Sequence, residues 1–206
     1  MIETLTTRRL ELRPWRLEDA TDLYAVARDP QVGPAAGWPP HRSIEESAEV
    51  IRTVFASPET YAVVLRESGR PVGCVGLLFS SSSHFRLGAT EAEVGYWIGT
   101  SWRGRGLMPE ALGEMVRRAF EELELTALWG SCFVGNEASR RVMEKCGFRY
   151  LRTESGLQDL AGGLPQMGEI LCLSRDEWQA LQHVYLRRAS ESDIPLIRQV
   201  AEVAFP

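Results

Sequence analysis

Residues 91–98 alternate between apolar and polar positions, which predicts a strand with two different faces. The even positions carry alanine, valine, tyrosine and isoleucine, and the odd positions carry glutamate, glycine and tryptophan. A turn rich in glycine and arginine follows at 103–106, and apolar residues then recur with helical spacing from Leu112 to Ala119. Pro109 suits the first turn of that helix, where its missing N–H would have no partner within the helix. The pattern therefore predicts a strand, a glycine-rich turn and a helix in succession.

Shorter patterns on either side predict further strands and helices, and their order predicts a mixed α/β fold around one sheet. Ser43 is a favourable N-cap with Glu46 three residues later, which predicts a capping box at a helix start. The segment 31–42 is rich in proline and glycine and is expected to be irregular. The polar residues 80–84 are expected to form a solvent-exposed loop. Strands are expected at 10–13, 61–66, 71–79, 126–134, 148–152 and 166–173, and helices at 17–28, 43–56, 136–146 and 174–182.

Composition and charge limit the class of protein. The chain has 206 residues, 44% of them hydrophobic, and can bury one good core with room for an appendage. Its net charge of −5 argues against a general affinity for nucleic acid or for an anionic membrane, so a polyanionic ligand would need a local positive patch. No apolar run approaches the roughly 20 residues of a membrane span, and the first residues lack the apolar core of a signal peptide. The four cysteines are far apart and are expected to be reduced thiols. These features predict a cytoplasmic protein.

The turn at 103–106 has the features of an anion site. The start of a helix leaves backbone N–H groups without intrahelical partners at the positive end of the helix dipole, and pyrophosphate is a common ligand there. Arg103 and Arg105 add positive charge beside it. Glycine-rich turns are common, so a tight strand-to-helix connection with solvated arginines is the alternative interpretation.

The sequence around this turn resembles a known family. The pattern Arg103-x-x-Gly106-x-Met108 is similar to the acyl-CoA-binding signature of the GNAT acetyltransferases, although methionine departs from the usual glycine or alanine. Three segments are similar to the Rim-type branch of this family, the ribosomal-protein N-terminal acetyltransferases. They are GRGLMPEAL at 104–112, TRRLELRPW at 7–15 and residues 136–148. The resemblance covers about residues 4–175, in order.

The resemblance implies a fold, a reaction and a set of cofactor-binding residues. The implied fold is the GNAT-like acyl-CoA N-acyltransferase fold, a mixed and mostly antiparallel sheet flanked by helices, with a splayed central strand pair. The implied reaction transfers acetyl from acetyl-CoA, without a metal, to a primary amine on a small molecule or at a protein N-terminus. A backbone N–H near Trp97 or Ile98 would stabilise the oxyanion, and Gly95 and Gly99 are compatible with a bulge or bend in that strand. The residues expected to bind acetyl-CoA are Tyr96, Trp97, Ile98, Arg103, Gly104, Arg105, Gly106, Leu107, Met108, Asn136 and Ser139.

Two residues are candidates for moving protons in this reaction. Glu93 lies ten residues before Arg103, as does the catalytic glutamate of the histone-acetylating branch, and is the candidate general base. The alternative is an exposed strand residue. An α-amine has a pKa of about 8, so part of it is already neutral near pH 7. A carboxylate, directly or through a water, therefore needs to shift the equilibrium between ammonium and amine only slightly. Many relatives carry a tyrosine acid where this chain has Met143, which cannot donate a proton. In the Rim-type pattern Ser139 takes that role and is the candidate acid, although a thiolate can also leave unassisted.

Other residues are candidates for contacting the acceptor or the phosphates. In the family, the loop 31–42 lies over the acceptor end of the cleft, so Trp38 could line that pocket or anchor the loop on the core. Glu91 shares a strand face with Glu93 and is a second candidate for the acceptor side and the reserve base. Asn136 suits an N-cap and, by resemblance, also holds the pantetheine arm. Three basic residues could reach the phosphates or remain surface charges: Arg140, Arg141 and Lys145.

The histidines and the end of the chain complete the expectations. The histidines are scattered without metal-ligand spacing and are expected to be structural or solvated; they are His41, His84 and His183. Residues 1–183 are expected to form one GNAT domain. Residues 184–206 resemble the opening strand and helix of a second GNAT domain, which would pack on the first domain or on a second copy; an ordinary C-terminal helix is the alternative. Two other functions remain open: a catalytically silent acyl-CoA-binding or sensing module, and the structural half of a tandem acetyltransferase.

Overall fold

The strands form a single mixed sheet. In the computed structural model, which describes residues 3–80, 82–157, 166–182 and 194, they run in the order β1-β2-β3-β4-β5-β6-β8-β7. Neighbouring strands are antiparallel except β5 and β6, which are parallel, so the expected mixed and mostly antiparallel sheet is confirmed. The predicted second-domain start at 184–206 lies outside the described residues, apart from Ile194. The strands are β1 (Leu5–Thr6), β2 (Leu10–Pro14), β3 (Thr60–Leu65), β4 (Pro71–Leu78), β5 (Glu91–Ile98), β6 (Ala127–Phe133), β7 (Arg149–Leu157) and β8 (Gln166–Ser174).

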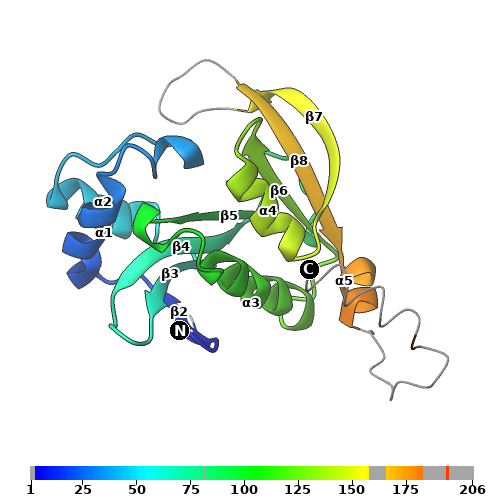
Figure 1. Ribbon diagram of the computed structural model, residues 1–206, viewed down its shortest axis with the longest axis horizontal. Helices are drawn as coiled ribbons and strands as arrows, with labels where there is room; N and C mark the ends of the chain where they lie inside the picture. Colours follow the sequence, from blue (N-terminus) through cyan, green and yellow to red (C-terminus); the bar gives the residue numbers. More distant parts are fainter. Residues whose placement is uncertain (1–2, 81, 158–165, 183–193, 195–206) are drawn as a thin grey trace.

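Helices cover both faces of the sheet (Figure 1). One core joins a face of the sheet to α3, α4 and α5, and a second core joins the opposite face to α1 and α2. The backbone N–H of Glu46 donates to Ser43 Oγ (3.1 Å), so Ser43 is an N-cap as expected. The predicted capping box there is wrong, because the Glu46 carboxylate accepts from the N–H of Arg42 instead. The helices are α1 (Ala20–Ala27), α2 (Ile44–Thr53), α3 (Leu107–Glu121), α4 (Glu137–Lys145) and α5 (Arg175–Gln182), with 3-10 turns at Leu17–Asp19, Pro34–Ala36 and Thr100–Trp102.

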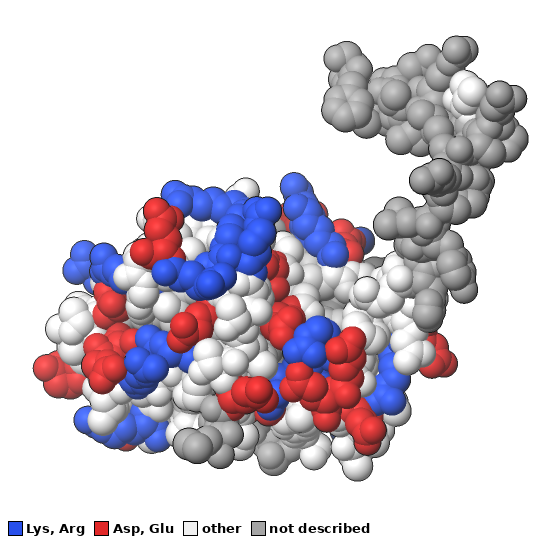
Figure 2. All heavy atoms as spheres, turned by 90° about the horizontal axis from the view of Figure 1, so that it is seen from below, with Lys and Arg blue, Asp and Glu red and all other residues white. Residues whose placement is uncertain are grey.

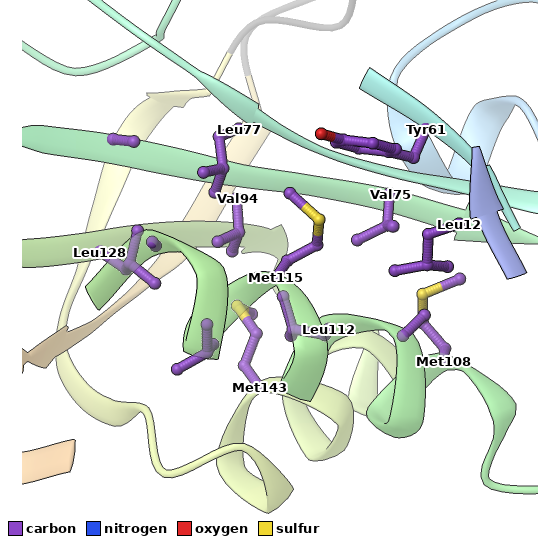
Figure 3. Packing of buried hydrophobic residues seen from close by; sticks show 14 of the residues in the cluster. Leu12, Tyr61, Val75, Leu77, Val94, Met108, Leu112, Met115, Leu128 and Met143 are labelled. Carbon is purple, nitrogen blue, oxygen red and sulfur yellow. The ribbon is translucent and has the colours of Figure 1, made fainter. Parts of the chain in front are cut away.

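The larger core fixes α3 against the sheet. Leu112 and Met115 of α3 are fully buried, and Figure 3 shows them among side chains of β4 and β5. Met143 of α4 enters the same core, where its sulfur would lie 2.5 Å from a Cβ placed on Gly130. Because burying one such side chain contributes about 1.5–3 kcal/mol, this core holds the turn before α3 at a set position relative to β5.

β5 and β6 pair over three residues and then separate. Glu93 and Trp129 form the last pair, although β5 continues to Ile98 and β6 to Phe133. On its other side, β5 stays in regular register with β4 as far as Ile98. The expected splayed pair is therefore confirmed, and it leaves one edge of the second half of β5 open.

The glycines of this strand do not form the bulge with which they were compatible. Gly95 pairs with Gly76 in regular register, and a Cβ on Gly95 would lie 2.9 Å from Leu78 Cδ1. A Cβ on Gly99 would lie 2.7 Å from the ring of Trp102. Close packing accounts for both glycines, and the opening begins where the pairing of β5 with β6 ends, at Glu93 and Trp129.

Charged side chains of both signs share the surface. Figure 2 shows Lys and Arg gathered along the upper rim of one face, while acidic and basic side chains intermingle over the rest. Positive patches therefore exist locally on a chain whose net charge is −5. Among the helices that the structure describes, none combines the length and the apolar character needed to cross a membrane.

Candidate functional site

The glycine-rich turn leads into α3 as the sequence predicts. Gly104 and Gly106 have φ angles of 75° and 71°, in the left-handed region that favours glycine. Gly106 is the N-cap of α3, and no side chain caps the helix there. The first N–H groups of α3 therefore remain for a ligand. Leu107 and Met108 come next, and their side chains are buried in the core.

Arg9 holds this turn from the segment before β2. Its Nη1 donates to the carbonyl oxygen of Arg105 (2.9 Å), and its Nη2 donates to that of Gly106 (3.1 Å). The Glu110 carboxylate accepts from Arg9 Nε (2.6 Å) and from Thr7 Oγ1 (2.6 Å). Burial alone would raise the pKa of Glu110, but the hydrogen bonds from Thr7 and Arg9 outweigh it, so this pKa lies below its ordinary value. The arginine is thereby oriented by a charged carboxylate.

A cavity of about 330 Å³ extends from the turn along the open edge of β5. Four segments line it: the end of β5, the turn with the start of α3, α4, and residues 32–36. The structure thus brings together nearly all residues expected to bind the cofactor, which are Tyr96, Trp97, Ile98, Arg103, Gly104, Gly106, Leu107, Met108, Asn136 and Ser139.

The open edge of β5 is formed by Tyr96 and Ile98. The N–H of Gly99 donates to the carbonyl of Val72 (2.9 Å) at the β4 side. Successive residues of a strand turn their backbone groups to opposite sides, so Trp97 also faces β4. The expectation that the backbone of Trp97 is free to pair with the cofactor is therefore wrong, because its amide is directed to β4. Trp97 still lines the cavity.

Residues 31–36, which we call the strap, lie across one side of the cavity. Arg103 Nη2 donates to the carbonyl of Gln31 (2.6 Å), and Asn136 Nδ2 donates to the carbonyl of Ala35 (3.2 Å). The Oδ1 of Asn136 accepts from the N–H of Ser139 (3.2 Å), so Asn136 is the N-cap of α4. Two residues expected to bind the cofactor therefore also connect the strap to the cavity wall.

Ser139 and Tyr96 face each other across the cavity. The Tyr96 hydroxyl lies 2.8 Å from the carbonyl oxygen of Ser139 and 3.0 Å from its Oγ. If the phenol donates to the carbonyl, it can accept from the serine hydroxyl. Burial raises the pKa of Tyr96 above its ordinary value, so the phenol is neutral. Ser139, the candidate acid, thus lines the cavity and has Tyr96 as a hydrogen-bond partner that the sequence did not indicate.

Glu93 is buried rather than exposed, with 3% of its surface accessible. Its Oε2 accepts from Ser83 Oγ (2.8 Å) and from the N–H of His84 (2.9 Å), and its Oε1 lies 3.1 Å from His84 Nδ1 and 3.4 Å from Ser131 Oγ. The expectation of a solvent-exposed loop at 80–84 is confirmed at Ser80, Ser82 and His84, whereas Ser83 is half-buried, and both Ser83 and His84 contact this carboxylate. The hydrogen bond to Glu93 raises the pKa of His84, although burial opposes it.

Three expected residues lie away from the cavity. Glu91 accepts from the N–H of Gly88 (2.7 Å) and closes the turn before β5. Trp38 anchors its loop: its ring centroid lies 5.6 Å from that of Trp97, edge to face, and a Cβ on Gly33 would lie 2.5 Å from it. Arg105 contributes its carbonyl to the contact with Arg9 and does not line the cavity.

The basic residues of α4 divide into two groups. Arg141 and Lys145 line the cavity. Arg140 instead pairs with Glu144 (2.8 Å) and Glu169 (2.9 Å) on the surface. Of the three, only Arg141 and Lys145 border the cavity, as Arg103 does from the turn.

The remaining chemistry of the described residues is limited. In the ranges that the structure describes, no group of three or more His, Cys, Asp or Glu could hold a metal. The cysteines are free, as expected. Burial raises the pKa of the thiols of Cys74 and Cys146 to about 12 and that of Cys132 to about 11. Such thiols are poor nucleophiles at neutral pH.

Comparisons with known proteins agree with this geometry. Residues 9–149 match the family model described as "Acetyltransferase (GNAT) domain". YdaF of Bacillus subtilis, named as a candidate ribosomal N-acetyltransferase, is 45% identical over 58 residues, 28% of this chain and 32% of YdaF. The FsC-acetyl coenzyme A-N(2)-transacetylase of Aspergillus fumigatus is 29% identical over 195 residues, which cover 90% of this chain and 82% of that protein. The solved structure of a candidate ribosomal-protein-serine acetyltransferase from Vibrio cholerae has a TM-score of 0.68 and 26% identity, and the match covers 84% of this chain and 97% of that one.

Proposed function

Since this chain belongs to the GNAT family and is an acetyl-CoA-dependent N-acetyltransferase, we propose that it acetylates a primary amine by direct attack in a ternary complex. The acceptor amine would meet the thioester where β5 and β6 separate. The observation that supports this best is the cavity: it joins the uncapped start of α3 to the open backbone edge of β5.

The two ends of the cavity suit the two ends of the acyl donor. The diphosphate would accept hydrogen bonds from the first N–H groups of α3, where the helix dipole is positive. The amide-rich pantetheine arm would pair with the free backbone groups of Tyr96 and Ile98, as a neighbouring strand would. The N–H of Ile98 or of Tyr96 is then the oxyanion donor, because that of Trp97 is directed to β4.

The transfer itself needs few groups once the reactants are aligned. The amine nitrogen attacks the carbonyl carbon of the thioester, and collapse of the tetrahedral intermediate breaks the C–S bond. Ser139, which contacts the Tyr96 hydroxyl and lines the cavity, would give the leaving thiolate its proton. The group that accepts the proton of the ammonium would lie on the opposite face of the sheet, around Glu93.

Two classes of acceptor are supported by different relatives. YdaF and the Vibrio cholerae protein carry names that refer to the ribosome or its proteins, which favours a polypeptide N-terminal amine. The Aspergillus fumigatus relative matches along most of both chains, and its name refers to acetyl transfer between acetyl coenzyme A and the N(2) of a compound abbreviated FsC, which favours a small-molecule amine. The first is the main proposal, because the Rim-like segments lie at the turn and at α4, beside the cavity.

An amine screen that follows thiol release from acetyl-CoA tests the proposal. The panel would contain peptides with free N-termini, the same peptides with blocked N-termini, amino acids and diamines, and mass spectrometry would confirm one added acetyl group. Cys74 and Cys132 are buried and Cys146 and Cys172 are half-buried, and burial raises the pKa of all four thiols, so their reaction with the thiol reagent should be slow. We expect release with free N-termini and none with blocked ones. Tight acetyl-CoA binding without acetylation of any amine would instead favour a silent acyl-CoA-binding module.

A further inference from the structure

The loop between β4 and β5 brings a histidine to the point where β5 and β6 separate. Phe85 of this loop packs on Trp129 with ring centroids 5.8 Å apart, and Trp129 belongs to the last β5–β6 pair. The preceding residue, His84, contacts Glu93, the other member of that pair. A cofactor arm that runs back along β5 from the turn would point its thioester toward this place.

Glu93 is poorly suited to take a proton from the amine directly. Within 3.4 Å, Oε1 has two hydrogen-bond partners and Oε2 has three, and 3% of the residue is exposed. A carboxylate that is enclosed by donors stabilises and orients its neighbours, but it presents no free lone pair to a substrate.

His84 has the features that Glu93 lacks. Its Nδ1 faces the carboxylate, so the Nδ1–H tautomer is favoured and Nε2 is left as the proton acceptor. Its side chain is 37% exposed, whereas that of Glu93 is 5% exposed. Glu93 is also the charged side chain that contacts His84 within the described residues. A carboxylate behind an imidazole is a common arrangement for general base catalysis.

We propose that His84 takes the proton of the acceptor ammonium and that Glu93 is the positioning residue that holds the imidazole. This inference rests on the proposed acetyl transfer. The ammonium gives one proton to Nε2 and becomes the neutral amine, whose lone pair forms the C–N bond. The C–S bond then breaks, and a second proton from nitrogen reaches the thiolate through Ser139. The imidazolium releases its proton to solvent, so the products are amide, CoA thiol and one proton.

His84→Asn is the sharpest variant, because asparagine can still donate to Glu93 but has no Nε2. We expect its kcat to fall about 100-fold at pH 7, with the Kd for acetyl-CoA within twofold of the wild type. Arg86→Ala, two residues along the same loop and free of hydrogen bonds and ion pairs among the described residues, serves as the control. In His84→Ala, added imidazole should restore part of kcat. Rescue requires a folded site, so it also excludes misfolding as the cause.

Glu93→Gln separates the two roles. The base must be neutral to accept a proton, so kcat should rise with pH through the pKa of His84, which Glu93 holds above its ordinary value. Glu93→Gln removes the negative charge beside His84, so the rise of kcat on the acidic side of the pH profile, its acidic limb, should occur at lower pH but should still be present. Loss of the limb in Glu93→Gln, with an unchanged profile in His84→Asn, would show that Glu93 is the base and overturn the proposal. If the wild type binds acetyl-CoA but acetylates no amine, the proposed function fails first.

Discussion

The guanidinium of Arg9 and the carboxylate of Glu110 lie 2.6 Å apart, Nε to Oε2, although 101 positions separate them in the chain. The pair links the segment before β2 to the first turn of α3. Its consequence is a fixed turn: the two remaining Arg9 nitrogens hold the carbonyls of Arg105 and Gly106. In a planar trans peptide, the N–H points away from the carbonyl. Arg9 therefore directs the amides of Gly106 and Leu107 to the opposite side.

We predict that Arg9→Gln weakens binding of CoA about tenfold, which corresponds to about 1.4 kcal/mol. Arg9→Lys should bind CoA nearly as weakly as Arg9→Gln, because an ammonium cannot bridge two carbonyls and a carboxylate in the way that a planar guanidinium does. Calorimetric titration with CoA measures both. Arg8→Ala is the control, since Arg8 is exposed beside Arg9. Wild-type affinity in Arg9→Lys would mean that charge, and not the fixed peptide planes, supports the site.

The neighbours Arg140 and Arg141 allow a matched comparison on one helix. Arg141 lines the cavity, whereas Arg140 is paired with Glu144 and Glu169. Arg141→Gln should raise the Kd for CoA about tenfold at low salt, because it removes a hydrogen bond to a charged group, and the difference should shrink as salt increases. Arg140→Gln should stay within twofold. Equal losses in the two variants would show that general surface charge, and not Arg141 itself, attracts the phosphates.

The strand, turn and helix at the centre of the site could be predicted because their signals are local. Alternation along β5, the left-handed glycines Gly104 and Gly106, and the spacing in α3 each depend on residues near in sequence. The splay between β5 and β6 was implied by family resemblance alone. The point at which the pairing ends, at Glu93 and Trp129, is not indicated by any pattern in the sequence of β5.

The residues that sequence reasoning missed make contacts that no local pattern indicates. Arg9 meets its partners across about a hundred positions, and His84 is placed by a loop without periodicity. A polar loop that precedes a strand with two glutamates, Glu91 and Glu93, was the available signal for His84. Trp38 shows the reverse case: composition allowed a binding or an anchoring role, and its packing on Gly33 and Trp97 is that of an anchor.

Tyr96 and Ser139 should behave as a coupled pair in catalysis. Ser139→Ala is expected to lower kcat about tenfold, less than a general acid usually contributes, because a thiolate can leave unassisted. Tyr96→Phe removes both contacts of the phenol with Ser139, to its carbonyl oxygen and to its Oγ, and should lower kcat by a smaller factor because the serine hydroxyl remains. The double variant should resemble Ser139→Ala, since the tyrosine acts through the serine. Steady-state rates with one amine measure all three. A larger loss in Tyr96→Phe than in Ser139→Ala would identify the phenol as the proton donor.

Asn136 has two separable contacts, one that caps α4 and one that ties down the strap. Its Oδ1 accepts from the N–H of Ser139, and its Nδ2 donates to the carbonyl of Ala35. Serine caps a helix nearly as well as asparagine but has no second donor that reaches the strap. Asn136→Ser should therefore unfold at nearly the same temperature as the wild type. In Asn136→Ala, the free energy of unfolding should fall by about 1 kcal/mol, and the melting temperature with it.

Both variants should raise the Kd for acetyl-CoA by a similar factor, because both lose the contact to Ala35 and the amide available to the pantetheine arm. Melting curves report the cap, and titrations at a temperature well below the melting point report the ligand. If Asn136→Ser binds acetyl-CoA as tightly as the wild type while Asn136→Ala does not, the cap alone organises the start of α4. The side-chain amide would then have no part in binding, and the strap would be held by Arg103.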